Sequence, residues 1–163
     1  MAHEVIDNFL AEEDHKRIAD TLLDAEFPWF YNSYVVGPEE EDTVYNYQFT
    51  HQFYAHYKWN SEFSHLMEPI VEKLRPRALI RIKANLSPVT NEIISGRWHT
   101  DYAFECKTAV YYVNTNNGFT KFRTNQVVES VANRMVIFDS HDLHTGATAT
   151  DVKARCVVNF NYL

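Results

Sequence analysis

Four side chains in the second half of the sequence could do chemistry together. His99 and Asp101 stand in the triplet His-Thr-Asp, His144 follows further on, and Arg155 comes shortly after it. Two imidazoles and one carboxylate are the ligands that hold a non-haem Fe(II) ion on one face and leave the other face open. The planar guanidinium of an arginine suits a carboxylate ligand, which it can bind through two hydrogen bonds. These residues therefore predict a ferrous site with an anion-binding arginine beside it.

The His-x-Asp motif is weak evidence by itself, because eight histidines and 22 acidic residues in 163 would produce such triplets by chance on an exposed strand face. Two observations favour a site. Residues two apart on a strand point to the same side, so both motif residues could reach one ion. In addition, His144 and Arg155 lie in apolar, strand-like sequence, where charged groups need a partner.

His141 competes with His144 for the third ligand position. We prefer His144, because it begins a predicted strand, whereas His141 lies in the polar turn before that strand.

The elements that must position these residues are mostly predicted strands. From residue 78 onward the pattern has period two and is divided by turn residues. Strands are predicted at residues 78–86, 97–103, 107–114, 119–123, 125–131, 134–139, 143–148 and 154–162. Many short strands at close spacing are typical of a sandwich or barrel of the jelly-roll kind.

The first half is predicted to support that β-rich part. Apolar residues recur at helical spacing in residues 11–25 and 61–74, and strands are predicted at residues 5–10, 27–36 and 45–54. We expect the helices to pack outside the sheet, which gives an α+β fold that is mainly β. The length predicts one domain over residues 1–163, with residues 1–76 as support and residues 77–163 as the jelly-roll core that carries the metal site.

Composition and sequence pattern disfavour some classes of function. A net charge of −7 disfavours nucleic-acid binding, which depends on neutralising phosphates. No apolar run approaches membrane-spanning length, and the N-terminus lacks the features of a signal peptide, so we predict a cytoplasmic protein with no membrane partner. Cys106 and Cys156 are expected to be free thiols.

The last predicted strand separates polar from apolar residues. Cys156, Val158, Phe160 and Tyr162 share one face, which should be packed core; Arg155, Val157, Asn159 and Asn161 share the other. The second face should therefore line either solvent or a polar cavity.

Several segments together carry a resemblance to a known family. They are Arg-Trp-His-Thr-Asp-Tyr (97–102), Thr-Ala-Val-Tyr-Tyr-Val-Asn (108–114), Asn-Gly-Phe-Thr-Lys-Phe (117–122), Arg-Met-Val-Ile-Phe-Asp-Ser (134–140) with the following His-Thr-Gly, and residues 155–162. From about residue 78 to the end, the chain resembles the Fe(II)- and 2-oxoglutarate-dependent oxygenase superfamily, in its prolyl-hydroxylase-like branch. Many relatives carry a second glycine where this chain has Phe119, which should affect loop shape more than iron binding.

The resemblance implies a double-stranded β-helix with iron held by His99, Asp101 and His144, and with Arg155 on the distal carboxylate of 2-oxoglutarate. It implies hydroxylation of an unactivated C–H bond by dioxygen, with ascorbate as a possible reductant. Because relatives that halogenate lack the carboxylate ligand, Asp101 argues for hydroxylation. The implied substrate is a peptidyl proline or another protein side chain; a free amino acid or small metabolite is the alternative.

Two further residues are candidates for contacts to the co-substrate, and each has a competing interpretation. Tyr112 matches a tyrosine that assists the arginine in relatives, but it would equally suit a buried core. Arg81, Lys83 and Asn85 share a strand face by alternation, and we select Asn85 as a co-substrate contact with Lys83 behind it; an ordinary solvated face is the competing interpretation.

The sequence does not identify the substrate. Aromatic and histidine side chains of the first half could form its rim: Trp29, Phe30, Tyr31, Tyr34, His51, Tyr54 and His56. The loops at residues 37–43 and 87–96 could be lids. Two other classes stay open, namely a non-catalytic module that binds a metal or sugar, which has no use for the arginine, and a nucleic-acid demethylase, which the charge disfavours.

Overall fold

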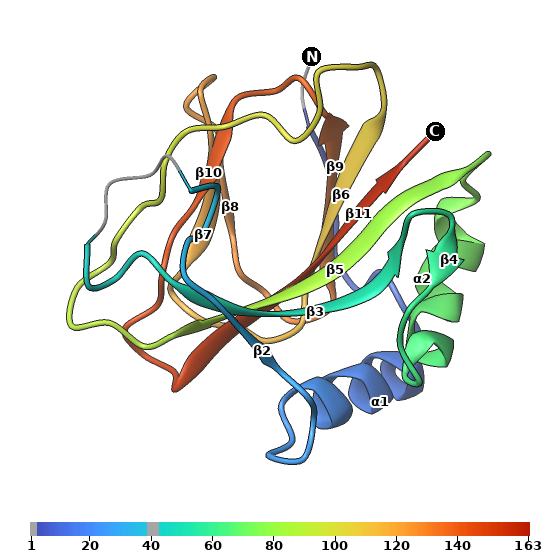
Figure 1. Cartoon of the computed structure of the whole chain (residues 1–163), viewed down its shortest axis with the longest axis horizontal. Helices are drawn as coiled ribbons and strands as arrows, with labels where there is room; N and C mark the ends of the chain where they lie inside the picture. The colour runs from blue at the N-terminus through green and yellow to red at the C-terminus, as the bar shows by residue number, and fades with distance from the viewer. Residues whose placement is uncertain (1–2, 39–42) are drawn as a thin grey trace.

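The computed structural model describes residues 3–38 and 43–163. Its larger sheet has the strand order β1 (Glu4–Ile6), β9 (Arg134–Asp139), β6 (Lys107–Tyr112), β11 (Ala154–Tyr162), β5 (Leu79–Pro88), β3 (Gln48–Ala55) and β2 (Phe30–Asn32), with β4 (Lys58–Trp59) paired to β3. A smaller sheet has the order β10 (His144–Gly146), β7 (Phe119–Phe122) and β8 (Val127–Glu129). Figure 1 shows the smaller sheet standing opposite the larger one, so that the two form the walls of a jelly roll.

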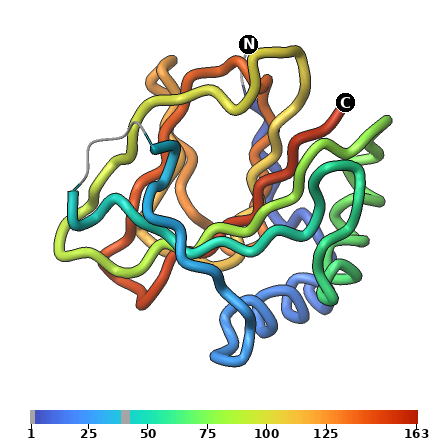
Figure 2. Tube along the Cα trace, in the orientation of Figure 1, coloured from blue at the N-terminus to red at the C-terminus, as the bar shows by residue number. Residues whose placement is uncertain are grey.

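The helices lie outside this roll, on the face of the larger sheet that points away from the smaller one (Figures 1 and 2). They are α1 (Glu12–Leu22), a short 3-10 helix (Ser64–Met67) and α2 (Glu68–Leu74). In α1, Ile18 and Leu22 are one turn apart and fully buried. α2 is followed by Arg75, which adopts a left-handed conformation just before Pro76.

Strand alternation gives the larger sheet two different faces. Toward the helices, the central strands place a packed core that includes Tyr111, Val158 and Phe160. Toward the smaller sheet they place a second apolar cluster that includes Val110 and Val157. The predicted separation of the last strand into two faces is confirmed, and its polar face points into the roll.

The predicted fold class, a mainly β jelly roll with helices packed outside, is confirmed. The strand predicted at residues 97–103 is wrong, because this segment pairs with β10 only through an isolated bridge between His99 and His144. The strand predicted at residues 27–36 is reduced to β2, and the helix predicted at residues 61–74 starts as a 3-10 helix. Cys106 and Cys156 are buried free thiols, as predicted.

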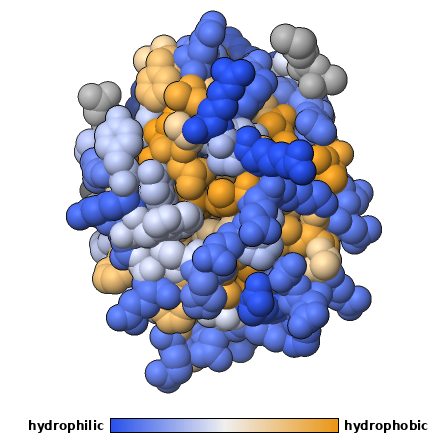
Figure 3. All heavy atoms as spheres, turned by 90° about the vertical axis from the view of Figure 1, so that its right-hand side faces the viewer, coloured by the Kyte–Doolittle hydropathy of each residue, from blue (hydrophilic) through white to orange (hydrophobic). Residues whose placement is uncertain are grey.

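Within the described residues, the helices are all too short or too polar to cross a membrane. Figure 3 shows the side of the molecule that carries α2 and β4, where hydrophilic side chains occupy most of the outline and apolar side chains show between them.

Candidate metal and anion-binding site

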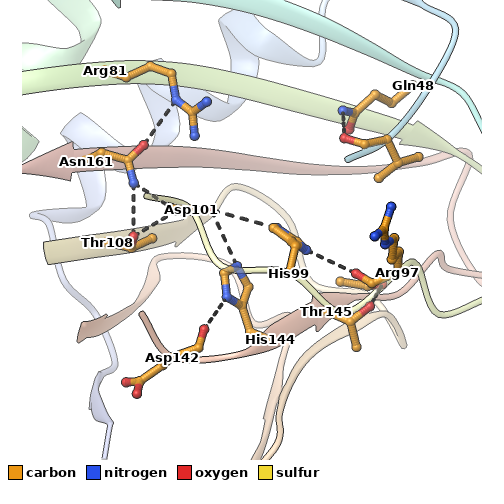
Figure 4. A network of polar contacts seen from close by, with 12 residues as sticks. Gln48, Arg81, Arg97, His99, Asp101, Thr108, Asp142, His144, Thr145 and Asn161 are labelled. Atoms are coloured by element: carbon orange, nitrogen blue, oxygen red, sulfur yellow. Dashed lines mark hydrogen bonds and ion pairs between the residues drawn. The ribbon is translucent and has the colours of Figure 1, made fainter. Parts of the chain in front are cut away.

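The three predicted ligands, His99, Asp101 and His144, converge at one point inside the roll (Figure 4). The Nε2 atoms of His99 and His144 lie 3.8 Å and 3.7 Å from Oδ1 of Asp101. The ligand atoms of these three residues lie within 4.8 Å of one another, as they must to hold one ion. His141 lies elsewhere, where its Nε2 contacts the carbonyl oxygen of Ala103.

The site brings together two segments that are distant in sequence. His99 and His144 exchange both backbone hydrogen bonds across an isolated antiparallel bridge, each N–H donating to the other's carbonyl oxygen at 3.0 Å. The backbone N–H of Asp101 donates to the carbonyl oxygen of Ser140 at 3.1 Å. These backbone contacts, rather than the predicted strand, bring the ligands together.

Backbone carbonyls orient both imidazoles. Nδ1 of His99 lies 3.1 Å from the carbonyl oxygen of Arg97, and Nδ1 of His144 lies 2.9 Å from that of Asp142. A ring that donates through Nδ1 has its free lone pair on Nε2, the atom that faces the other ligands. Burial, followed by the nearby His99, lowers the pKa of His144, so this ring is held in the neutral form that binds a metal.

The carboxylate of Asp101 is oriented by hydrogen bonds to its other oxygen. Its Oδ2 accepts from Oγ1 of Thr108 and from Nδ2 of Asn161, both at 2.8 Å, and Nε of Arg81 donates to Oδ1 of Asn161 at 3.1 Å. Burial acts to raise the pKa of Asp101, but His144, the two hydrogen bonds and Arg81 outweigh it, so the pKa is lowered. The group is therefore an ionised carboxylate whose Oδ1 faces the two imidazoles.

Asn161, Thr108 and Arg81 were not predicted from the sequence as supports for Asp101. Strand alternation placed Asn161 on the polar face of the last strand, and this was the only indication in the sequence that it could face the site. Its partners depend on strand register: Asn161 lies opposite Arg81 on β5 and opposite Thr108 on β6.

Replacing Asn161 by alanine should weaken metal binding by roughly 10–100-fold, the usual cost of losing a contact that orients a ligand. Asn159→Ala is the matched control, because Asn159 lies on the same strand face as Asn161 but makes no hydrogen bond to Asp101. The measurement is titration of the purified variants with Mn(II). Equal weakening in both variants would show that the contact to Asp101 has no special importance.

The three ligands open into a cavity of about 750 Å³ between the sheets. Its lining includes polar side chains from the inner face of β5 and β11, namely Arg81, Lys83, Asn85, Ser87, Arg155 and Asn159. The predicted rim residues do not line it in the described part of the chain. The first-half residues that line the cavity are instead Val35, Val36, and residues 43 and 45–48.

Arg155 is buried in the wall of this cavity. Its Nε donates to Oγ of Ser130 at 3.0 Å, and its Cζ lies 5.8 Å from the ring centre of Tyr112. Among the described residues no carboxylate forms an ion pair with it. Burial lowers the pKa of Arg155, but an arginine remains charged in proteins. A buried guanidinium without a counter-charge is costly, and an anionic ligand in the cavity would remove that cost.

The two weaker co-substrate predictions fall in different places. Asn85 lines the cavity, and its Oδ1 has no hydrogen-bond partner among the described residues. The same holds for Oδ1 of Asn159. Tyr112 is fully buried and does not line the cavity; its hydroxyl donates to Oγ1 of Thr120 at 2.8 Å. Burial raises the pKa of Tyr112, so its hydroxyl stays protonated.

Gly118 makes room for Arg155. A Cβ at this position would lie 2.6 Å from Cδ of Arg155, 2.8 Å from Oδ1 of Asn116 and 3.0 Å from the carbonyl oxygen of Ala147. We expect Gly118→Ala to destabilise the protein by about 1–3 kcal/mol, the usual cost of overpacking. Gly37→Ala is the control, because nothing lies within 4 Å of its added Cβ. Urea unfolding measures both, and equal stability of the two variants would contradict the prediction.

The segment predicted as a lid, residues 87–96, forms part of the cavity wall. Oγ1 of Thr90 lies 2.6 Å from Oγ1 of Thr148, and the N–H groups of Ile94 and Gly96 donate to Thr148 and Gly146. In the other predicted lid, residues 37–43, residues 39–42 lie outside the described part of the chain.

The donor set fits an Fe(II) ion, because two imidazoles and one carboxylate on one face leave other coordination positions open. Arg155, which has no carboxylate partner among the described residues, lies in the same cavity and fits a co-substrate that carries a carboxylate.

No protein-family model matches the sequence, and no curated protein matches it. Among solved structures, the chain is similar to a prolyl hydroxylase from Trichoplax adhaerens in complex with a hypoxia-inducible factor peptide (TM-score 0.71, 12% identity, 98% of this chain and 83% of that one). A viral collagen prolyl hydroxylase from Paramecium bursaria Chlorella virus-1 is also similar (TM-score 0.66, 12% identity, 100% and 97%).

A third similar structure is the α-ketoglutarate-dependent epimerase SnoN of nogalamycin biosynthesis (TM-score 0.67, 13% identity, 99% and 78%). These likenesses show that the chain has the fold of prolyl hydroxylases and other 2-oxoglutarate-Fe(II) oxygenases.

Proposed function

We propose that this protein is an Fe(II)- and 2-oxoglutarate-dependent dioxygenase that hydroxylates an unactivated C–H bond. The observation that carries the proposal is the buried Arg155, which shares one cavity with the His99, Asp101 and His144 cluster and has no carboxylate partner among the described residues. A set of three metal ligands alone would suit a simple binding module. A buried cation facing the same cavity calls for an anionic co-substrate as well.

Each residue has a role in this proposal. His99, Asp101 and His144 hold the iron, which when bound supplies the activation of dioxygen, coupled to decarboxylation of 2-oxoglutarate. Arg155 binds the distal carboxylate of 2-oxoglutarate. Asn85 adds a polar contact from the cavity wall, and Tyr112 supports the arginine through its ring, since its hydroxyl is committed to Thr120.

The substrate we propose first is a peptidyl proline or another protein side chain. Support comes from the likeness to prolyl hydroxylases, one of them in complex with a peptide. A free amino acid or small metabolite is the second candidate, favoured by the likeness to an epimerase of a biosynthetic pathway.

The test is succinate formation by the purified protein with Fe(II), 2-oxoglutarate, oxygen and ascorbate as reductant. We expect slow succinate formation without added substrate and none in Asp101→Ala. If the wild-type protein forms no succinate and binds 2-oxoglutarate no better with metal than without it, the enzyme proposal fails and a non-catalytic binding module remains.

A further inference from the structure

The described residues of the cavity wall carry more positive charge than iron and 2-oxoglutarate require. Among its described lining residues are four cationic side chains, Arg81, Lys83, Arg97 and Arg155, and one carboxylate, Asp101. Under the proposed function, the two charges of Fe(II) and the two carboxylates of 2-oxoglutarate cancel. The excess of cations in the wall therefore remains when metal and co-substrate are bound.

Lys83 is a cation of the cavity wall without a polar partner among the described residues. It is partly buried on the inner face of β5, and none of the described residues forms an ion pair or hydrogen bond with its ammonium group. Burial, followed by repulsion from Arg81, lowers the pKa of Lys83 to about 8, although Asp101 acts in the opposite direction. A cation in this position is stabilised by an anion arriving from the cavity.

Arg81 adds a second cation at the same place. Residues 81 and 83 are two apart on one strand, so their side chains leave the same face, roughly 7 Å apart at their bases. Arg81 donates from Nε to Asn161, and none of the described residues accepts from its two Nη groups (Figure 4). Two neighbouring cations with uncommitted donors suit a carboxylate.

This pair is separate from Arg155. In the register between β11 and β5, Arg155 lies opposite Ser87 and Asn159 lies opposite Lys83. Ser87 and Lys83 are four residues apart, which corresponds to roughly 13 Å along the strand. Since 2-oxoglutarate would use one carboxylate at Arg155 and the other at the metal, neither is left for Lys83.

We propose that Lys83, together with Arg81, binds a carboxylate of the substrate. The inference rests on the proposed function and deepens it, because it makes the substrate a carboxylate-bearing molecule, either a free organic or amino acid or a peptide with an acidic side chain or free C-terminus. The carboxylate would anchor the substrate on the β5 side of the metal, at the end of the cavity away from Arg155.

The experiment measures binding on protein loaded with Mn(II) and 2-oxoglutarate, so that no turnover is needed. The probes are the free amino acids, their carboxamides, and capped tripeptides that contain aspartate, glutamate, asparagine or glutamine. Because Mn(II) relaxes protons held near it, ligand-observed NMR detects binding inside the cavity. The variants are Lys83→Met, which removes the charge at similar length, Lys83→Arg, which keeps it, and Lys58→Met as an exposed control on β4.

We expect at least one carboxylate probe to bind about tenfold or more tightly than its carboxamide, as a charge-assisted hydrogen bond would give. Lys83→Met should abolish that difference, while Lys83→Arg and Lys58→Met keep it. Binding of free acids would indicate a small-molecule substrate, and binding of acidic tripeptides would indicate a peptide substrate. The inference is overturned if no carboxylate probe binds, or if acids and carboxamides bind equally.

The affinity for 2-oxoglutarate separates this inference from the proposed function. We expect Lys83→Met to leave it within about threefold of the wild-type value. If Lys83→Met weakens 2-oxoglutarate binding as much as loss of Arg155 does, Lys83 belongs to the co-substrate site and the inference fails alone. If the wild-type protein shows no metal-dependent binding of 2-oxoglutarate, the proposed function itself fails.

Discussion

Asp101→Ala should lose tight Fe(II) binding while keeping the fold. The variant has two imidazoles left to hold the ion and no negative charge to favour it. The expected loss of affinity exceeds the roughly 10–100-fold that follows from removing an outer contact. Anaerobic titration with Fe(II) measures the affinity, and circular dichroism measures the fold.

The control for this variant is Asp20→Ala, because Asp20 is exposed on α1 and pairs with Lys16 far from the cavity. His99→Ala should behave like Asp101→Ala, since it removes another ligand. If Asp101→Ala bound Fe(II) as the wild-type protein does, the convergence of the three side chains would have no connection with a metal.

Arg155→Met should separate the co-substrate site from the metal site. Methionine keeps much of the volume of the side chain and removes the charge. Truncating one partner of a buried, hydrogen-bonded charge pair costs about 2–5 kcal/mol, which is a factor of about 30 or more in the dissociation constant of 2-oxoglutarate. Fe(II) affinity should stay within about threefold, because Arg155 contacts none of the three metal ligands.

Calorimetric titration of Mn(II)-loaded protein measures the affinity for 2-oxoglutarate. Arg155→Lys keeps the charge without the planar fork, so its affinity should fall between those of the wild-type protein and Arg155→Met. The melting temperature adds an independent reading. 2-Oxoglutarate should raise it in the wild-type protein by mass action and have little effect in Arg155→Met. Equal losses of metal and 2-oxoglutarate binding would mean that Arg155 supports the structure of the whole site.

The route by which the ligands converge differed from the predicted one. A strand over residues 97–103 would have aligned His99 and Asp101 by alternation. The structure joins His99 to β10 by a single bridge instead and turns the chain after it, so that Asp101 meets Ser140. Alternation describes one strand, but pairing depends on which neighbours reach that strand, and β10 is only three residues long.

The rim of the cavity shows a similar limit. Aromatic residues of the first half were predicted there on residue type alone. His51, for example, is buried instead, with its two ring nitrogens against the carbonyl oxygen of Pro28 and the hydroxyl of Ser61. Aromatic and histidine side chains suit a core as well as a binding site, so their type does not decide between the two.

The sequence alone determined the residue types of the site and the faces they share. Period-two alternation in β11 separated Arg155 and Asn161 from the apolar core residues between them, because successive strand residues point to opposite sides. The choice of His144 over His141 also followed from the local pattern. These inferences depend on neighbours in the chain, which a sequence displays directly.

Only the tertiary structure decided which polar residues support one another and which have no partner. Asn161 reaches Asp101 because the register sets it between Arg81 and Thr108. Arg155 and Lys83 face the cavity, and neither forms an ion pair with a described residue. A shift of one residue in that register would turn the same side chains to the opposite face. Register comes from the packing of distant segments, so the alternation of a single strand cannot specify it.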